Sequence, residues 1–217
     1  LTYQPLGSFR GAAFLGFSEY VLVSAEVMKV ADLNSFVARV QSQPDHFYYA
    51  SSGNGSVTHI AMASFLDKAG LRMTHIPLKG TGEIFSEILA GRVQAAMVST
   101  FSAQAYMSDL RLNFLAITDK DRSERYPNLP TISESGYPHF MWLSWVGLLA
   151  PAAAPQSKIQ EVNRALGRVM NDPLIKNRFN QLGIASKAMT LENFDALLKD
   201  EWRKASLLIR QSKVIVD

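Results

Sequence analysis

The chain lacks cysteine, carries few charged residues and has no long apolar run. Without cysteine it cannot form a disulfide, a thiolate metal site or a cysteine nucleophile. No stretch reaches the roughly 18 apolar residues of a membrane-spanning helix. Only 19% of the residues are charged, with a net charge of +3, and the basic residues are scattered. No basic stripe forms, so we expect no nucleic-acid partner.

The composition that remains is that of a folded protein with a substantial core. Hydrophobic residues make up 47% of the 217 residues, and the mean hydropathy is +0.01. This length allows one large domain or two small ones. The chain opens at Leu1 without a methionine. We therefore expect that an N-terminal part is missing.

The first half of the chain alternates strand, turn and helix. Apolar patterns predict strands over 12–23, 47–50, 73–78, 93–98 and 112–118, and helices over 31–40, 57–69, 83–90 and 101–107. A proline-rich stretch over 119–138, with a short helix expected over 132–135, leads to a strand over 142–150. Three helices over 156–170, 173–182 and 191–211 follow, with a strand over 184–188. This alternation predicts an α/β fold with mostly parallel sheets and helices on both faces.

The first turn, Ser51–Ser56, is the leading candidate for a ligand site. Gly53 and Gly55 allow the backbone to approach a ligand closely, and Asn54 stands between them. Hydroxyls come from Ser51, Ser52, Ser56 and Thr58, and His59 follows them. The N-terminus of the next helix directs free N–H groups and partial positive charge at this turn. Such a turn suits an anion such as a carboxylate, although an ordinary capped turn is the alternative.

Two further turns resemble the first. The second turn, Lys79–Gly82, has Lys79, Gly80 and Thr81 as candidate contacts, with Thr81 as the expected helix cap. The third turn, Ser99–Thr100, ends the strand over 93–98. In an open parallel sheet, ligands bind beyond the carboxyl ends of the strands, which is where these turns stand. Simple helix capping is again the alternative for both.

The sequence gives little support for a catalytic site, a metal site or a cofactor site. A hydrolase could pair Ser51, Ser52 or Ser56 with His59 or His75, but no G-x-S-x-G elbow is present. The four histidines show no ligand spacing with carboxylates, so we predict no metal site. The first turn lacks the Lys-Ser/Thr ending of a phosphate loop, and Thr58 occupies the third glycine position of G-x-G-x-x-G. We therefore predict neither an enzyme nor a cofactor.

Six segments carry residue patterns of a known family, in the family's order along the chain. They are Tyr49–Ser56 with His59, His75–Gly80, Leu89–Val93, Leu115–Thr118 with Arg122, Leu129–Pro138, and Trp145–Pro151. The corresponding patterns are Y-A-S-S-G-x-G-S-x-x-H, H-V-P-Y-K-G, L-x-G-x-V, L-A-V-T with a following R, V-P-T-x-x-E-x-G-x-P and W-x-G-L-L-A-P. In these segments the chain resembles the Bug (TctC-like) substrate-binding proteins of tripartite tricarboxylate transporters. The resemblance covers nearly the whole chain.

The resemblance implies a two-lobed, periplasmic-binding-protein-like (type II) fold that closes on an organic acid or amino acid. It implies a periplasmic receptor that serves a two-component membrane permease. One lobe would comprise 25–143. The other, with its first part truncated, would comprise 1–23 and 145–217, with hinges near 20–24 and 142–150. The second contact loop of the family would precede Leu1.

One departure from the family pattern bears on the ligand. The stretch Val98–Thr100 replaces one that often carries Asp in the family, which removes a negative charge and favours a more anionic ligand. A rival interpretation remains open, the effector-binding domain of a transcription regulator. It would require a helix-turn-helix upstream of Leu1.

Overall fold

The computed structural model describes residues 3–211, with side chains as far as Leu207, and divides them into two compact units. Unit 1 comprises the residues up to Ser18 together with Ser144–Leu207, and unit 2 comprises Glu19–Leu143 with the residues from Leu208 onward. Residues 1–2 and 212–217 of the predicted first lobe lie outside the described residues. That the units act as lobes closing on a ligand, with hinges near 20–24 and 142–150, remains a proposal.

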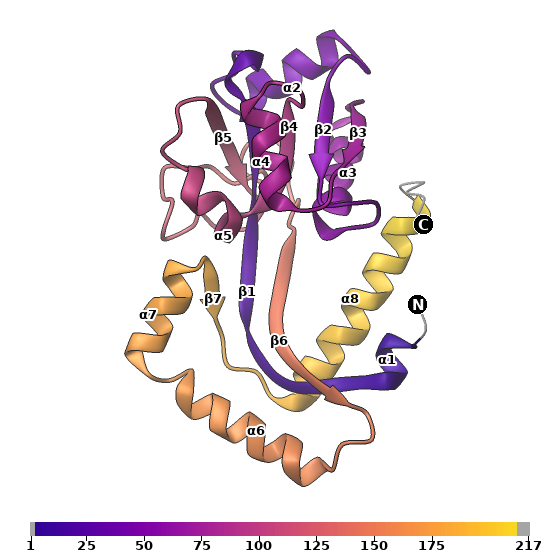
Figure 1. Ribbon diagram of the computed structural model, residues 1–217, viewed down its shortest axis with the longest axis vertical. Coiled ribbons are helices and arrows are strands. Elements are labelled where there is room, and N and C mark those ends of the chain that lie inside the picture. Colours follow the sequence, from indigo (N-terminus) through magenta and orange to yellow (C-terminus); the bar gives the residue numbers. More distant parts are fainter. Residues whose placement is uncertain (1–2, 212–217) are drawn as a thin grey trace. The chain divides into compact units, whose positions relative to one another are not determined.

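Unit 2 is built on a sheet with the strand order β3-β2-β4-β1-β5 (Figure 1). Its strands are β1 (Phe9–Ala25, of which unit 2 holds the second half), β2 (Tyr48–Ser51), β3 (Thr74–Pro77), β4 (Ala95–Ser99) and β5 (Leu112–Ile117). Strand β2 pairs in parallel with β3 and β4, whereas β1 is antiparallel to β4 and β5. The α/β class is confirmed, and the sheet is mixed because β1 runs against its neighbours.

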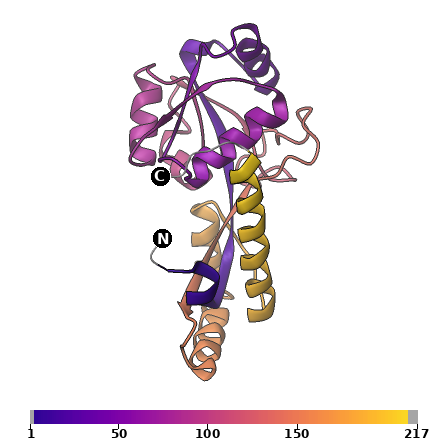
Figure 2. The same cartoon turned by 90° about the vertical axis from the view of Figure 1, so that its right-hand side faces the viewer.

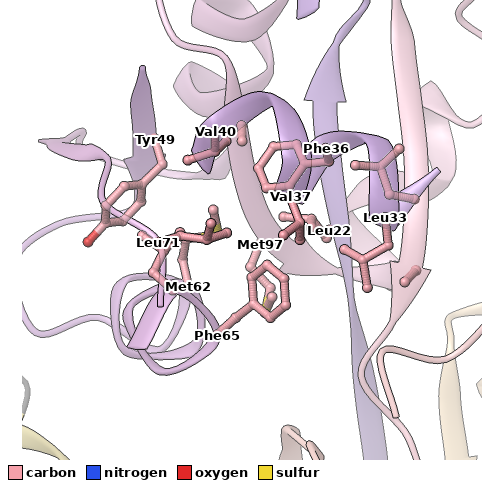
Figure 3. Packing of buried hydrophobic residues seen from close by; sticks show 14 of the residues in the cluster. Leu22, Leu33, Phe36, Val37, Val40, Tyr49, Met62, Phe65, Leu71 and Met97 are labelled. Carbon is pink, nitrogen blue, oxygen red and sulfur yellow. The ribbon is translucent and has the colours of Figure 1, made fainter. Parts of the chain in front are cut away.

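Helices cover both faces of this sheet, because its strands alternate apolar side chains from face to face. On β1, Tyr20 and Leu22 join the hydrophobic cluster under α2 (Leu33–Ser42) and α3 (Val57–Ala69), shown in Figure 3. Val21 and Val23 join the opposite cluster, under α4 (Thr81–Leu89). Parallel neighbours need such crossover helices, and α3 and α4 provide them.

Local signals set the bounds of α3, as predicted. The side chain of Ser56 caps its first turn by accepting from the His59 N–H, and Gly70 ends it in the left-handed region at φ 63°. The helix expected over 132–135 is wrong, since this segment forms turns. Its backbone is tied to β5 instead: Ile117 N–H donates to Pro130 O, and Ile132 N–H donates to Ile117 O.

Unit 1 contains the first half of β1 and most of β6 (Leu143–Pro151), which pairs with it. Strand β7 (Ile184–Ser186) is antiparallel to β1. Its helices are α1 (Pro5–Ser8), α6 (Gln156–Val169), α7 (Pro173–Gln181) and the part of α8 (Leu191–Gln211) up to Leu207. Helix α8 has 21 residues and is continuous (Figure 2). Phe194 on α8 is fully buried, and a Cβ at Gly11 or Gly147 would lie 2.6 Å from its ring. Glycine at these positions lets the helix pack closely on the strands.

Candidate anion-binding site

The sheet of unit 2 brings the three predicted turns to one edge. Strands β2, β3 and β4 run in the same direction and end at Ser51, Pro77 and Ser99. The first two turns are neighbours, since Leu78 N–H donates to Ser51 O at 2.9 Å. The third turn follows β4, on the other side of β2. This is the edge at which ligands bind in open parallel sheets.

The first turn takes a backbone shape that requires its two glycines. Gly53 has φ 125° and Gly55 has φ 70°, both in the region that favours glycine. Ser56 N–H donates to Gly53 O at 3.2 Å, which closes the turn immediately before α3. Because α3 has 13 residues, its N-terminus offers a full helix dipole to whatever lies over the turn. Asn54, at the tip, is exposed.

Thr58 holds the first turn from below. Its Oγ1 accepts from Ser52 N–H at 2.9 Å, and lies 3.0 Å from both the Ser52 and Ser56 hydroxyls. The side chain is buried, so its hydrogen-bonding capacity is taken up within the turn. Among the predicted contacts, Thr58 therefore shapes the turn, whereas Ser52, Gly53, Asn54, Gly55 and Ser56 keep some exposure. Their role as ligand contacts remains a proposal.

Ser51 is fully buried, and of the two histidines proposed as its partner it contacts His75. Its Oγ donates to Gly53 O at 3.0 Å and lies 2.6 Å from His75 Nε2. His59 instead accepts the Gly55 N–H through Nδ1 at 3.1 Å. The serine–histidine contact thus exists with His75, but a fully buried hydroxyl offers a substrate no access. The geometry argues for a structural bond within the turn and against a nucleophile.

The aromatic groups beneath the turn are uncharged at neutral pH. Burial lowers the pKa of His59, and burial together with the charge of His59 lowers the pKa of His75 to about 4. Burial also raises the pKa of Tyr49 to about 12. Tyr49 is not among the predicted site residues, and the sequence offers His75 only as the possible base of a hydrolase. Strands β2 and β3 place both rings beneath the turn. Both residues also lie in segments that match the family patterns.

The second turn is held differently from the way the sequence predicts. Gly80 is the N-cap of α4 and no side chain caps it, so the prediction that Thr81 is the cap is wrong. The carboxylate of Glu83 ties the turn to the helix by accepting the Lys79 N–H, one residue before the N-cap, at 3.0 Å. Lys79 itself is exposed. Thr81 begins the helix as its first residue, and its hydroxyl is therefore not needed for capping.

In the third turn, Ser99 caps α5 (Thr100–Ala103) by accepting from Ser102 N–H at 3.2 Å. A 3-10 helix over Gln104–Tyr106 follows, in place of the single helix expected over 101–107. Thr100 is fully buried and donates to Glu19 O at 3.4 Å. Only Ser99 of this pair is partly exposed.

Glu19 is an acidic residue at this edge that is not among the predicted site residues. Its carboxyl is half-buried, and desolvation and the nearby Asp119 raise its pKa, while a hydrogen bond from Ser123 and the charge of Arg125 oppose the rise. The signal was present, since Glu19 is the sole charged residue in the apolar run over 12–23. It lies beside the third turn, since its backbone carbonyl accepts from the Thr100 hydroxyl.

Two residues within the family-like segments serve the scaffold. Arg122 Nε donates to Glu134 Oε1 at 2.8 Å, and Arg122 Nη1 donates to Pro127 O at 3.2 Å. This bridge fastens the proline-rich stretch. Within residues 3–211, no three histidine, aspartate or glutamate side chains gather in a way that could hold a metal ion.

Several solved structures, a periplasmic binding protein among them, share this fold. A Rhodopseudomonas palustris protein solved with adipate, Rpa4515, gives a TM-score of 0.91 at 18% identity, over 98% of this chain and 71% of that one. The periplasmic binding protein BugD gives 0.87 at 22% identity, over 98% and 72%. MatC from Rhodopseudomonas palustris, with bound malate, gives 0.84 at 23% identity, over 96% and 72%. The fold is therefore that of a two-lobed periplasmic binding protein.

The chain belongs to the tripartite tricarboxylate transporter receptor family (TctC), whose model matches residues 1–214. A relative from Pseudomonas sp. strain P51, the UPF0065 protein of the tcbD-tcbE intergenic region, is 29% identical over 206 residues, 93% of this chain and 61% of that protein. Protein BugT of Bordetella pertussis is 24% identical over 212 residues, 98% and 65%. The chain thus spans less than two thirds of the length of these relatives. Among its described helices, none is both long and apolar enough to cross a bilayer.

Proposed function

We propose that the chain is the receptor part of a periplasmic solute-uptake or sensing system and binds a small carboxylate at the first turn. The observation that carries this proposal is the first turn itself: two glycines with positive φ, placed at the N-terminus of a 13-residue helix and at the ligand-binding edge of the sheet. The dipole of this helix favours an anion there. Lys79, Gly80 and Thr81 of the second turn and Ser99 of the third would complete the site.

The family and its solved members support the same class of ligand. The family is one of transporter receptors, and two structures that share this fold were solved with adipate and with malate, both dicarboxylates. A receptor of this family would deliver its ligand to a two-component membrane permease. Binding without chemical conversion fits the burial of Ser51, whose hydroxyl contacts the His75 ring.

A thermal-shift screen tests this proposal. Adipate, malate, aromatic acids and amino acids are added to the 217-residue chain and to the longest natural reading frame that contains it. A ligand at about a hundredfold excess over Kd stabilises a protein by about 2.7 kcal/mol, which corresponds to a rise in Tm of about 5–10 °C. The neutral diamide of the best acid is the control and should give no shift. If no acid shifts either form, the receptor proposal is wrong.

A further inference from the structure

Two histidine rings stack directly beneath the first turn. His59, on α3, and His75, on β3, have ring centroids 3.7 Å apart at an interplanar angle of 16°. Tyr49, on β2, stacks on His75 at 4.9 Å and 27°. Tyr49 and His59 are buried, and His75 is partly buried. Three elements thus contribute one ring each to a single cluster under the anion-suited backbone.

Each imidazole contacts a different atom of the turn. His59 Nδ1 accepts from Gly55 N–H at 3.1 Å, and His75 Nε2 lies 2.6 Å from Ser51 Oγ. The first bond fixes a tautomer, because a nitrogen that accepts cannot carry a proton. Neutral His59 is therefore protonated at Nε2. If His59 took up a second proton, Nδ1 would become a donor facing another donor, the Gly55 N–H.

His75 is less sensitive to protonation. The Ser51 hydroxyl donates to Gly53 O and accepts from Gly53 N–H at 3.2 Å. His75 Nε2 can then act as the donor to Ser51 Oγ, and it keeps that role in the charged ring. The turn therefore depends on His59 being neutral, whereas His75 can keep its contact with the turn in either charge state.

The groups that face the two rings do not stabilise the charged form of an imidazole. The side chains that face the two rings are Tyr49 from β2, Ser51 at the start of the turn, and the rings themselves. Burial is the cause that lowers the pKa of His59, and no carboxylate of the described chain opposes it. Protonation of His59 would also place its charge against the neighbouring ring of His75.

We propose that His59 is the positioning residue of the first turn: through the Gly55 amide its neutral imidazole holds the turn in the anion-binding shape, and protonation releases it. This inference rests on the proposed function for its biological meaning. Acidification would then weaken carboxylate binding beyond the effect of protonating the ligand. The free energy of unfolding would fall in the same direction. In the unfolded chain the histidines have a pKa near 6.5, so the unfolded chain takes up protons before the folded one does. Stability therefore declines as the pH falls from about 6.5 toward about 4.

The deciding measurement is hydrogen exchange of the Gly55 amide by NMR, on the 217-residue chain without ligand. His59→Leu removes the acceptor at similar size, whereas His59→Asn places Oδ1 where Nδ1 stood and does not titrate. We expect the Gly55 protection factor to fall about tenfold in His59→Leu and to be largely restored in His59→Asn. In the wild type it should fall on acidification from pH 7 to 5, but not in His59→Asn. His46→Asn, at an exposed histidine, is the control and should behave as wild type.

Affinity for adipate or malate supplies the second measurement. The ratio of Kd values between wild type and His59→Asn at each pH cancels protonation of the ligand, and it should rise as the pH falls. Unchanged Gly55 protection in His59→Leu, or a wild-type profile that is flat with pH, would overturn the positioning role. Should His59→Leu fail to fold, the wild-type titration against His59→Asn still decides. If Gly55 responds as expected but no carboxylate binds, the positioning role holds and the receptor proposal fails.

Discussion

The first and second turns follow neighbouring parallel strands and lead into helices at the same edge, yet they are held in opposite ways. Buried side chains support the first turn from below, with Thr58, Ser51 and His59 each bonded to it. The second turn has one surface carboxylate, Glu83, on its Lys79 N–H. A turn held from below presents its outer backbone groups in place before a ligand arrives, which lowers the cost of binding. Two turns that both contain glycine and hydroxyl-bearing residues can therefore differ in how firmly they hold the groups that would contact a ligand.

The largest loss of stability is expected from one isosteric substitution made at both turns. Thr58→Val removes the oxygen that accepts the Ser52 N–H and contacts two hydroxyls, so it should lower the free energy of unfolding by about 2 kcal/mol. Thr81→Val, at the first residue of α4, should change it by less than about 0.5 kcal/mol. Urea unfolding of both variants measures the difference. Equal effects would show that the two turns are held alike.

A glycine-to-alanine pair should give individual changes in stability that are smaller than that of Thr58→Val and opposite in sign. At Gly53 the φ of 125° is strained for alanine, so Gly53→Ala should cost about 1–2 kcal/mol and weaken carboxylate binding. Gly82 lies inside α4 with nothing within 4 Å of a new Cβ, so Gly82→Ala should stabilise the protein by about 0.5–1 kcal/mol. Thermal unfolding measures both signs. A destabilising Gly82→Ala would contradict the placement of this residue in the helix.

The smallest effect is expected from the support of the second turn. Glu83→Ala removes the acceptor of the Lys79 N–H, but water can replace it at this exposed site, so the loss should be about 0.5 kcal/mol. Kd for the best carboxylate should change by less than about threefold. Glu124→Ala, at an exposed residue outside both turns, is the matched control. A loss as large as that of Thr58→Val would remove the distinction between the turns.

Much of the fold could be predicted because its signals are local. Helix α3 begins after Ser56 and ends before Gly70, and both residues act through bonds within one turn of the chain. The direction of β1 could not be predicted, because the alternation of apolar residues is the same in either direction. The N-cap of α4 was misassigned to Thr81, since a threonine hydroxyl suits that position and the sequence does not show that Thr81 is already the first helical residue, with Gly80 as the N-cap.

In the candidate site, too, some features follow from neighbouring residues in the sequence and others from contacts between distant ones. The sequence by itself determined the family, the anion-suited first turn and its two glycines, since backbone shape and helix dipole depend on neighbouring residues. Tertiary structure decided what lies under that turn. Ser51 and His75 are 24 residues apart, and only the parallel register of β2 with β3 brings them into contact. Burial then decides which of the predicted hydroxyls remain open to a ligand, because a buried polar group must find its partner within the fold.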